Sequence, residues 1–232
     1  MIITIDGPAG SGKSSAARIV AKELGYALLN TGMLYRAAAY VVLTRHNFEV
    51  QGEFPTFSDE AFERLTNPDE DDLAALEHLE YHVEGPSVTE ATIDITSRLY
   101  EPWIDKPSAV ISQNEDVRDI IVAMQRAVAQ NHDVVAEGRD CGSVVFPDAE
   151  FQFFLTASLD IRAQRIASDA ERGRGVDFAT LKQRLAERDE RDMNRSISPL
   201  QVSSNARVID NSNLSMAQTV DRIVNVVKYG QE

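Results

Sequence analysis

The chain has 232 residues, of which 43% are apolar, which is enough for one elaborated domain with a substantial buried core. Its 37 acidic residues outnumber its 23 lysines and arginines, and the formal charge of −14 disfavours a polymeric nucleic-acid partner. A single cysteine, Cys141, excludes an intrachain disulfide framework and fits a reducing compartment. With neither a leader-like N-terminus nor a run of about 18 apolar residues, we expect a cytoplasmic protein without a membrane partner.

A glycine-rich loop follows the first predicted strand. Residues 2–6 predict a buried strand and residues 15–24 a helix, and between them lies Gly7-Pro8-Ala9-Gly10-Ser11-Gly12-Lys13-Ser14. The glycines let backbone N–H groups approach a polyphosphate, Lys13 adds a cation, and the hydroxyl of Ser14 can ligate Mg²⁺. Because strand, loop and helix follow in this order, we favour a nucleoside triphosphate site over an ordinary glycine-rich turn.

The next segments predict a second strand, a helix and an insert. Residues 26–29 favour a short buried strand, and helical spacing over residues 33–45 places Tyr35 and Arg36 in the first helical turn. Residues 48–72 are acidic and broken by proline, which indicates short helices, one of them capped by Ser58 or Asp59. Residues 78–83 and 91–96 alternate in polarity, which predicts an antiparallel hairpin.

His78 and His82 lie four residues apart in the first strand of that predicted hairpin. A metal-binding pair is one interpretation, and solvated strand residues are the favoured one, because no cysteine or third histidine accompanies them.

The second half of the chain predicts three more strands among helices. The strands are expected at residues 133–137, 151–155 and 207–210, and the helices at residues 115–131, from Ser158 to about 171, from Asp177 to Asn194, and after a capping box at Ser215. Together with residues 2–6 and 26–29, this pattern predicts an α/β fold, a five-stranded parallel sheet flanked by helices.

Ligands of such a sheet collect at the carboxyl ends of its strands, so we expect loops 7–14, 30–36 and 138–140 to face one crevice. Arg36 and Arg139 are placed to hold a second phosphate as bidentate forks. The alternatives are that Arg36 is a solvated helix residue and that Arg139 pairs with one of the many carboxylates.

Charged residues crowd the helix that ends near Asn194. Such a run is commonly a solvated face, yet Arg188, Arg191, Asp192 and Arg195 fall in one sector of this helix. Three guanidinium groups beside one carboxylate predict a mobile lid that supplies cations to a moving phosphoryl group and excludes water.

Four motifs, in order along nearly the whole chain, resemble those of bacterial cytidylate kinases, which are nucleoside monophosphate (NMP) kinases of the P-loop class. They are residues 4–14 (TIDGPAGSGKS), 29–36 (LNTGMLYR), 137–149 (EGRDCGSVVFPDA) and 188–195 (RDERDMNR) with Pro199-Leu200. The resemblance implies a P-loop core at 1–47, 111–172 and 200–232, an inserted antiparallel β NMP-binding subdomain at 48–110, and a helical lid at 173–199.

The resemblance also implies a reaction and a set of site residues. The expected reaction is transfer of the γ-phosphoryl group of MgATP to CMP or dCMP in a monomeric enzyme, with Lys13, Arg188 and Arg195 as catalytic residues. ATP would bind at Gly7, Pro8, Ala9, Gly10, Ser11, Gly12, Lys13, Ser14 and Ser15, with Mg²⁺ on Ser14. Thr31, Tyr35, Arg36, Arg139 and Arg195 would surround the acceptor phosphate, Arg188 and Asp192 the ribose, and Arg118 and Asp140 the cytosine.

One position departs from the family pattern. The resemblance implies a cytosine-contacting serine nine residues before Arg118, where this chain has Ala109, so either the contact moves by one residue to Ser108 or it is absent. Two alternative functions are a P-loop kinase for another small acceptor, such as UMP, shikimate or a nucleoside, and a regulatory nucleotide switch. Asp140 distinguishes the first, because a carboxylate accepts from the N4 amino group of cytosine and repels O4 of uracil.

Overall fold

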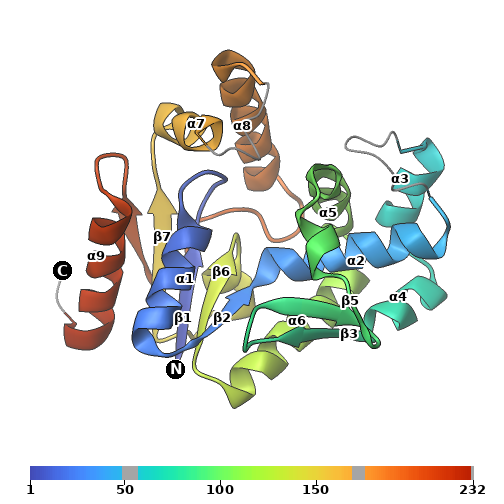
Figure 1. The fold of residues 1–232 in the computed structure, drawn as a ribbon, viewed down its shortest axis with the longest axis horizontal. Coiled ribbons are helices and arrows are strands. Elements are labelled where there is room, and N and C mark those ends of the chain that lie inside the picture. The colour runs from blue at the N-terminus through green and yellow to red at the C-terminus, as the bar shows by residue number, and fades with distance from the viewer. Residues whose placement is uncertain (49–56, 169–175, 231–232) are drawn as a thin grey trace. The chain divides into compact units, whose positions relative to one another are not determined.

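Figure 1 shows a computed structural model of the chain, which describes residues 1–48, 57–168 and 176–230. The chain divides into two compact units, one formed by Met1–Leu29 with His132–Glu232 and the other by Asn30–Asn131. No helix in the described ranges is long and apolar enough to cross a membrane. The expected division into core, NMP-binding subdomain and lid stays a prediction.

A five-stranded sheet organises the first unit, which confirms the predicted parallel sheet. Its strand order is β2-β6-β1-β7-β8, and β1 runs parallel to both of its neighbours. The strands are β1 (Ile2–Asp6), β2 (Ala27–Asn30), β6 (Val134–Gly138), β7 (Phe151–Thr156) and β8 (Ala206–Asp210). Central β1 therefore ends at Asp6 beside Gly138 of β6, so the two loops that follow these strands start side by side.

The two faces of β1 meet different partners because successive side chains point to opposite faces. Ile3 and Ile5 are fully buried in a core with α1 (Lys13–Leu24) and α9 (Met216–Tyr229). Thr4 and Asp6 face a short π-helix, η3 (Cys141–Val145), which follows β6. One face of β1 is thus apolar and structural, and the other is polar and continues into the loops.

Local capping signals set where the remaining helices of this unit begin. The hydroxyl of Ser158 accepts a hydrogen bond from Ile161 N at the start of α7 (Leu159–Ala167), and Asp177 accepts one from Thr180 N at the start of α8 (Phe178–Met193). Ser215 forms the predicted capping box of α9 with Gln218. The predicted end of the α7 helix near residue 171 lies outside the described residues.

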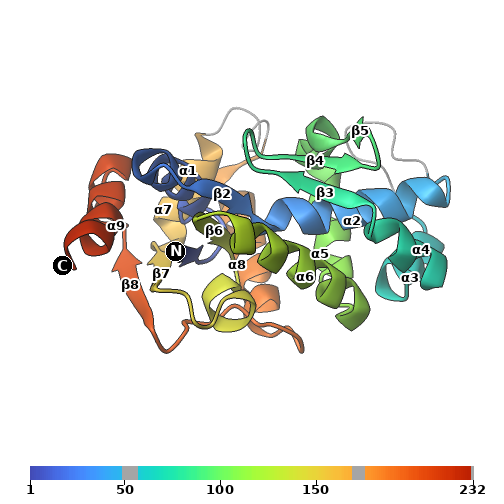
Figure 2. The same ribbon diagram turned by 90° about the horizontal axis from the view of Figure 1, so that it is seen from below.

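A nearly fully buried helix, α2 (Thr31–Arg45), organises the second unit. Its residues from Ala37 to Leu43 are all buried except Tyr40, because α3 (Asp59–Thr66), α4 (Glu70–Leu76), α5 (Asp105–Ile111), α6 (Glu115–Asn131) and β4 (Ser87–Glu90) pack around it. Figure 2 shows α2 lying among these elements. The apolar spacing predicted this helix, and its burial explains why alanines and valines fill its length.

The acidic insert folds onto a buried carboxylate. Ser58 caps α3 as predicted, and Asp69 and Asp72 form a capping box at the start of α4. The side chain of Asp72 is fully buried and lies within ion-pair distance of Arg45, His46 and Arg64. Three basic groups around one acid let this carboxylate be buried. Residues 49–56 of the insert lie outside the described part of the chain.

The predicted hairpin is wrong in its second strand. The first strand is β3 (Leu79–His82), but its partner is β4 at Ser87–Glu90, and a two-residue strand, β5 (Ile93–Asp94), completes a three-stranded antiparallel sheet. Val88 is fully buried opposite Tyr81, and Ala91, at a positive φ of 53°, turns the chain after β4. Val88 of β4 and Ile95, which follows β5, both pack into the core of this unit, so both segments bury an apolar residue.

His82 at the end of β3 and His78 in the turn before it are both exposed, so the solvated part of the favoured interpretation holds and the strand begins one residue after His78. His82 lies 3.0 Å from the hydroxyl of Thr89, and neither His78 nor His82 belongs to a metal-binding cluster among the described residues. Two short 3₁₀-helices, η1 (Thr96–Tyr100) and η2 (Pro102–Ile104), then lead into α5.

Candidate functional site

The glycine-rich loop leaves β1 through a position that only glycine can occupy. Gly7 has φ of 149°, and a Cβ atom placed there would lie 2.1 Å from the carbonyl oxygen of Leu155. The loop ends at Gly12, and α1 begins at Lys13 with no side-chain cap and no acidic residue in its first turn. The first N–H groups of α1 are therefore available to an anionic ligand.

Lys13 is buried at the start of α1. Burial lowers the pKa of its amino group from 10.5 to about 7, and the positive charges of Arg139 and Arg188 act in the same direction. The carboxylates of Glu137 and Asp192 oppose this shift. An anionic ligand would strongly stabilise the charged form of this lysine, because the protein itself solvates the charge poorly. This gives a physical basis for the prediction that Lys13 binds phosphate.

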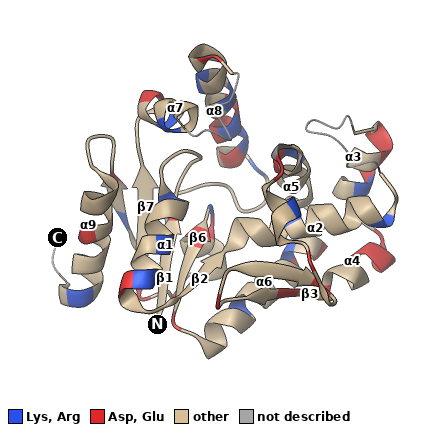
Figure 3. Cartoon of the chain, viewed as in Figure 1, with Lys and Arg blue, Asp and Glu red and all other residues tan. Residues whose placement is uncertain are grey.

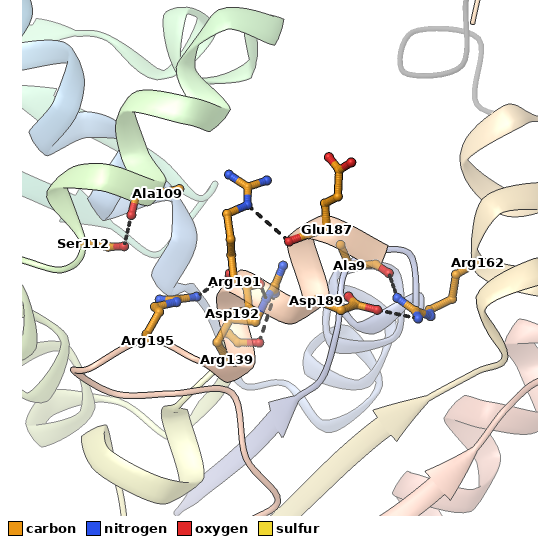
Figure 4. A network of polar contacts seen from close by, with 11 residues as sticks. Ala9, Ala109, Ser112, Arg139, Arg162, Glu187, Asp189, Arg191, Asp192 and Arg195 are labelled. Carbon is orange, nitrogen blue, oxygen red and sulfur yellow. Dashed lines mark hydrogen bonds and ion pairs between the residues drawn. The ribbon is translucent and has the colours of Figure 1, made fainter. Parts of the chain in front are cut away.

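Asp192 of α8 joins two of the predicted arginines (Figure 4). Its two carboxylate oxygens accept hydrogen bonds from Nε of Arg139 at 2.9 Å and from Nη2 of Arg195 at 2.8 Å. Burial acts to raise the pKa of Asp192, but the positive charges of Arg139, Arg195 and Arg188 outweigh it and the pKa is lowered. These three arginines and the lysine thus form one cationic group around a shared carboxylate.

Arg191 does not belong to this group. It is exposed, and its Nε donates to the carbonyl oxygen of Glu187, one turn earlier in α8. Figure 3, which colours the ribbon by residue type, shows basic and acidic residues mixed along the length of α8. The sector expected from helical spacing therefore divides, with Asp192 on the buried side and Arg191 in solvent.

Asp6 is a site residue that the sequence interpretation missed. Its carboxylate accepts hydrogen bonds from the backbone N–H groups of Cys141 and Gly142, at 3.0 and 2.7 Å. Burial raises the pKa of Asp6 to about 6, although these two hydrogen bonds act to lower it. Asp6 ties the strand before the glycine loop to the segment after Asp140, and an acid ending an apolar strand was its only sequence signal.

The other residues that the sequence interpretation missed form hydrogen bonds with the backbone of the glycine loop. Arg162 and Arg165 of α7 and Asn211, which follows β8, donate hydrogen bonds to carbonyl oxygens of the loop. They come from segments about 150 and 200 residues away from the loop in the sequence. No local pattern in the sequence marks these contacts.

Four of the residues predicted for the acceptor belong to the second unit, whereas Asp140 is buried in the first unit, directly before η3. Thr31 is the first residue of α2, Tyr35 is buried, and the guanidinium of Arg118 lies over the ring of Tyr35 at 5.5 Å. Arg36 donates to Leu99 O at 3.1 Å and forms an ion pair with Asp105 at 2.5 Å. The structure thus groups Thr31, Tyr35, Arg36 and Arg118 within the second unit.

The structure adds a second serine to the question of the missing cytosine contact. The hydroxyl of Ser108 donates to the carbonyl oxygen of Asp105, inside α5. Ser112, buried one turn after Ala109, donates its hydroxyl to Ala109 O, and its own carbonyl accepts from Arg118 at 3.3 Å. The assignment of Ser108 stays a prediction, and Ser112 contacts Arg118 through its backbone carbonyl.

A family model described as cytidylate kinase matches residues 3–229. The chain belongs to the cytidylate kinase family. This membership confirms the resemblance seen in the sequence motifs. Cytidylate kinase from Streptococcus uberis is 36% identical over 222 residues, covering 95% of this chain and 93% of that protein. Cytidylate kinase from Caldanaerobacter subterraneus is 35% identical over 227 residues, covering 97% and 94%.

A solved structure shares the fold of this cytidylate kinase family member. Shikimate kinase from Bacteroides thetaiotaomicron superposes with a TM-score of 0.50 at 12% identity, and the match covers 98% of each chain. At this identity the likeness concerns the fold alone, a P-loop kinase sheet with flanking helices.

Proposed function

We propose that the protein is a kinase of CMP and dCMP that transfers the γ-phosphoryl group of ATP to the 5′-phosphate of the acceptor. The observation that carries this proposal is the family match over residues 3–229, to which the buried Lys13 within a cationic group adds a chemical reason. Phosphoryl transfer requires positioning and positive charge rather than covalent participation of the protein. We further propose that the enzyme is a cytoplasmic monomer that needs no nucleic-acid partner.

The donor side of the reaction is assigned to the glycine loop. Residues Gly7 to Ser15 would bind the phosphates of ATP through backbone N–H groups and Lys13. The hydroxyl of Ser14 is exposed in the first turn of α1, and a hard oxygen there suits Mg²⁺. Bound Mg²⁺ would neutralise phosphate charge, and Lys13, Arg188 and Arg195 would compensate the charge that spreads over the moving phosphoryl group.

A further set of residues is proposed to bind the acceptor nucleotide. Thr31, Tyr35, Arg36, Arg139 and Arg195 would bind the acceptor phosphate, and Arg188 and Asp192 would bind the ribose. Three of the proposed phosphate ligands already pair with carboxylates, Arg36 with Asp105 and the other two with Asp192. Arginines placed to hold carboxylate oxygens have the geometry to hold phosphate oxygens, which supports this assignment.

Cytosine recognition is assigned to Asp140 and Arg118, with Ser108 as a further contact. Asp140 is buried, and an ionised carboxylate only accepts hydrogen bonds. It would therefore favour the N4 amino group of cytosine over the O4 oxygen of uracil. Selection for cytosine would come from this single acceptor.

The deciding experiment is a panel of CMP, dCMP, UMP and AMP assayed with ATP and Mg²⁺, with product nucleotides separated by chromatography. CDP and dCDP should be the main products. Asp140→Asn should reduce the preference for CMP over UMP by ~10-fold or more, and Asp148→Asn, an exposed acid in the same segment, should leave it unchanged. Hydrolysis of ATP without CDP would indicate a switch, and equal turnover of UMP would remove the base assignment.

A further inference from the structure

Two backbone carbonyl groups of the glycine loop accept hydrogen bonds from side chains outside the loop. Ala9 O accepts a hydrogen bond from Nη1 of Arg162 at 3.1 Å. Ser11 O accepts two, from Nη1 of Arg165 at 3.2 Å and from Nδ2 of Asn211 at 2.9 Å. The donors come from two segments outside the loop, Arg162 and Arg165 from α7 and Asn211 from the chain after β8.

The direction of a carbonyl fixes the direction of the next N–H group. In a planar trans peptide the C=O of one residue and the N–H of the following residue point in opposite directions. Holding Ala9 O and Ser11 O therefore aims the N–H groups of Gly10 and Gly12 away from these donors. Gly10 adopts φ of 76°, a backbone conformation that residues with a side chain rarely adopt.

The three donors are themselves fixed in place. Arg162 is buried and also donates to Ala157 O at 3.0 Å. Asn211 is 1% exposed, its amide oxygen accepts from Arg165 at 2.9 Å, and its backbone N–H donates to Thr156 O at the end of β7. Rigid partners of this kind orient a loop at a lower entropic cost than mobile ones.

One of these donors also reaches the charged helix α8. Nη2 of Arg162 forms a partly buried ion pair with Oδ2 of Asp189 at 2.6 Å, and Figure 4 shows the guanidinium of this arginine contacting both Asp189 and Ala9. Asp189 follows Arg188 directly in the chain. The arginine that orients the loop is therefore tied to the helix that carries Arg188 and Asp192.

We propose that Arg162, Arg165 and Asn211 are positioning residues that aim the Gly10 and Gly12 N–H groups at the phosphates of the donor nucleotide. The proposal rests on the proposed function, since it takes that loop as the ATP site. None of the three residues needs to touch the substrate. Their effect passes through the two peptide planes.

The main test is Asn211→Asp, a change of nearly equal shape. The new carboxylate cannot donate to Ser11 O and repels it, but it still accepts from Arg165. KM for ATP and the Kd for inorganic tripolyphosphate should both rise roughly ten-fold, and KM for CMP should stay within two-fold. Asn225→Asp makes the same chemical change at an exposed position of α9 and should alter none of these values.

Tripolyphosphate separates this proposal from a role in nucleobase binding. If Asn211→Asp weakens ATP but leaves tripolyphosphate binding unchanged, the residue acts on the nucleoside and the proposal is overturned. An equal loss for ATP and CMP would indicate general damage to the fold and would also overturn it. The tripolyphosphate titration needs no turnover, so a failure to form CDP would refute the proposed function and leave this test readable.

A second variant covers the case in which Asn211→Asp does not fold, as judged by circular dichroism. Arg165→Lys keeps the charge at a half-buried position but cannot bridge Ser11 O and both oxygens of Asn211. It should raise the Kd for tripolyphosphate and KM for ATP by a similar factor of about five. Unchanged tripolyphosphate affinity in this folded variant would overturn the proposal.

Discussion

Replacing Lys13 by methionine should stabilise the ligand-free protein while removing its activity. Methionine has a similar length and needs no solvation of a charge. Burial lowers the pKa of Lys13 from 10.5 to about 7, so the charged form is poorly tolerated in the folded state. At pH 7 this shift corresponds to about 4 kcal/mol lost from the free energy of unfolding, which Lys13→Met would recover in large part.

The pH dependence of the gain in stability of Lys13→Met tests whether it comes from the lowered pKa of Lys13. Because the folded-state pKa lies below the unfolded one, the unfolded chain binds more protons between pH 7 and 10.5, and the contribution of Lys13 to stability rises with pH in that window. The stabilisation by Lys13→Met should therefore shrink to about 1 kcal/mol at pH 9.5.

Urea unfolding followed by circular dichroism, at pH 7 and at pH 9.5, measures both values. Lys22→Met, on the exposed side of the same helix, is the matched control and should change stability by less than about 0.5 kcal/mol at either pH. A variant Lys13→Met that is less stable than the wild type, or a gain that does not depend on pH, would refute the reasoning. Phosphoryl transfer in the same variant should fall below detection.

Two further predictions concern the charges of the site. ATP binding at pH 8 should be accompanied by uptake of close to one proton, because Lys13 is largely neutral in the ligand-free protein and charged beside a triphosphate. Calorimetry in buffers of different ionisation enthalpy measures this proton uptake, and no uptake would contradict the lowered pKa of Lys13. Arg188→Ala should lower kcat by at least ~10²-fold in a folded protein. The control is Arg184→Ala, because Arg184 is exposed one turn earlier in α8, and it should leave kcat unchanged. An unchanged kcat in Arg188→Ala would remove Arg188 from the mechanism.

The sequence predicted the features that local chemistry determines. Strand and helix order, the caps at Ser158, Asp177 and Ser215, and the parallel sheet all follow from residue patterns within about ten positions. The predicted position of the second strand of the small sheet was wrong because residues 87–90, which form the strand, and residues 91–96, where we expected it, both alternate in polarity. Each segment also buries an apolar residue in the same core, Val88 in the first and Ile95 in the second, so burial does not distinguish them.

The candidate site was predictable where it rests on motifs and not where it rests on distant contacts. The motifs drew attention to Lys13, Arg139 and Asp192, which the structure gathers into one charged group. They gave no sign of Asn211, which reaches Ser11 across 200 residues of sequence. Every residue has a backbone carbonyl, so a side chain that binds a carbonyl does not require a particular residue type at that position. Such a contact therefore produces no recognisable sequence pattern.

The carboxylate of Asp192 has a consequence for the ligand-free state. Two guanidinium groups that approach one another repel, and without an intervening anion Arg139 and Arg195 would spend much of their time extended into solvent. Asp192 serves them as an internal counter-ion, at 2.9 and 2.8 Å. The cationic group is therefore preorganised before any nucleotide arrives, and a ligand need not meet the full entropic cost of ordering two long side chains.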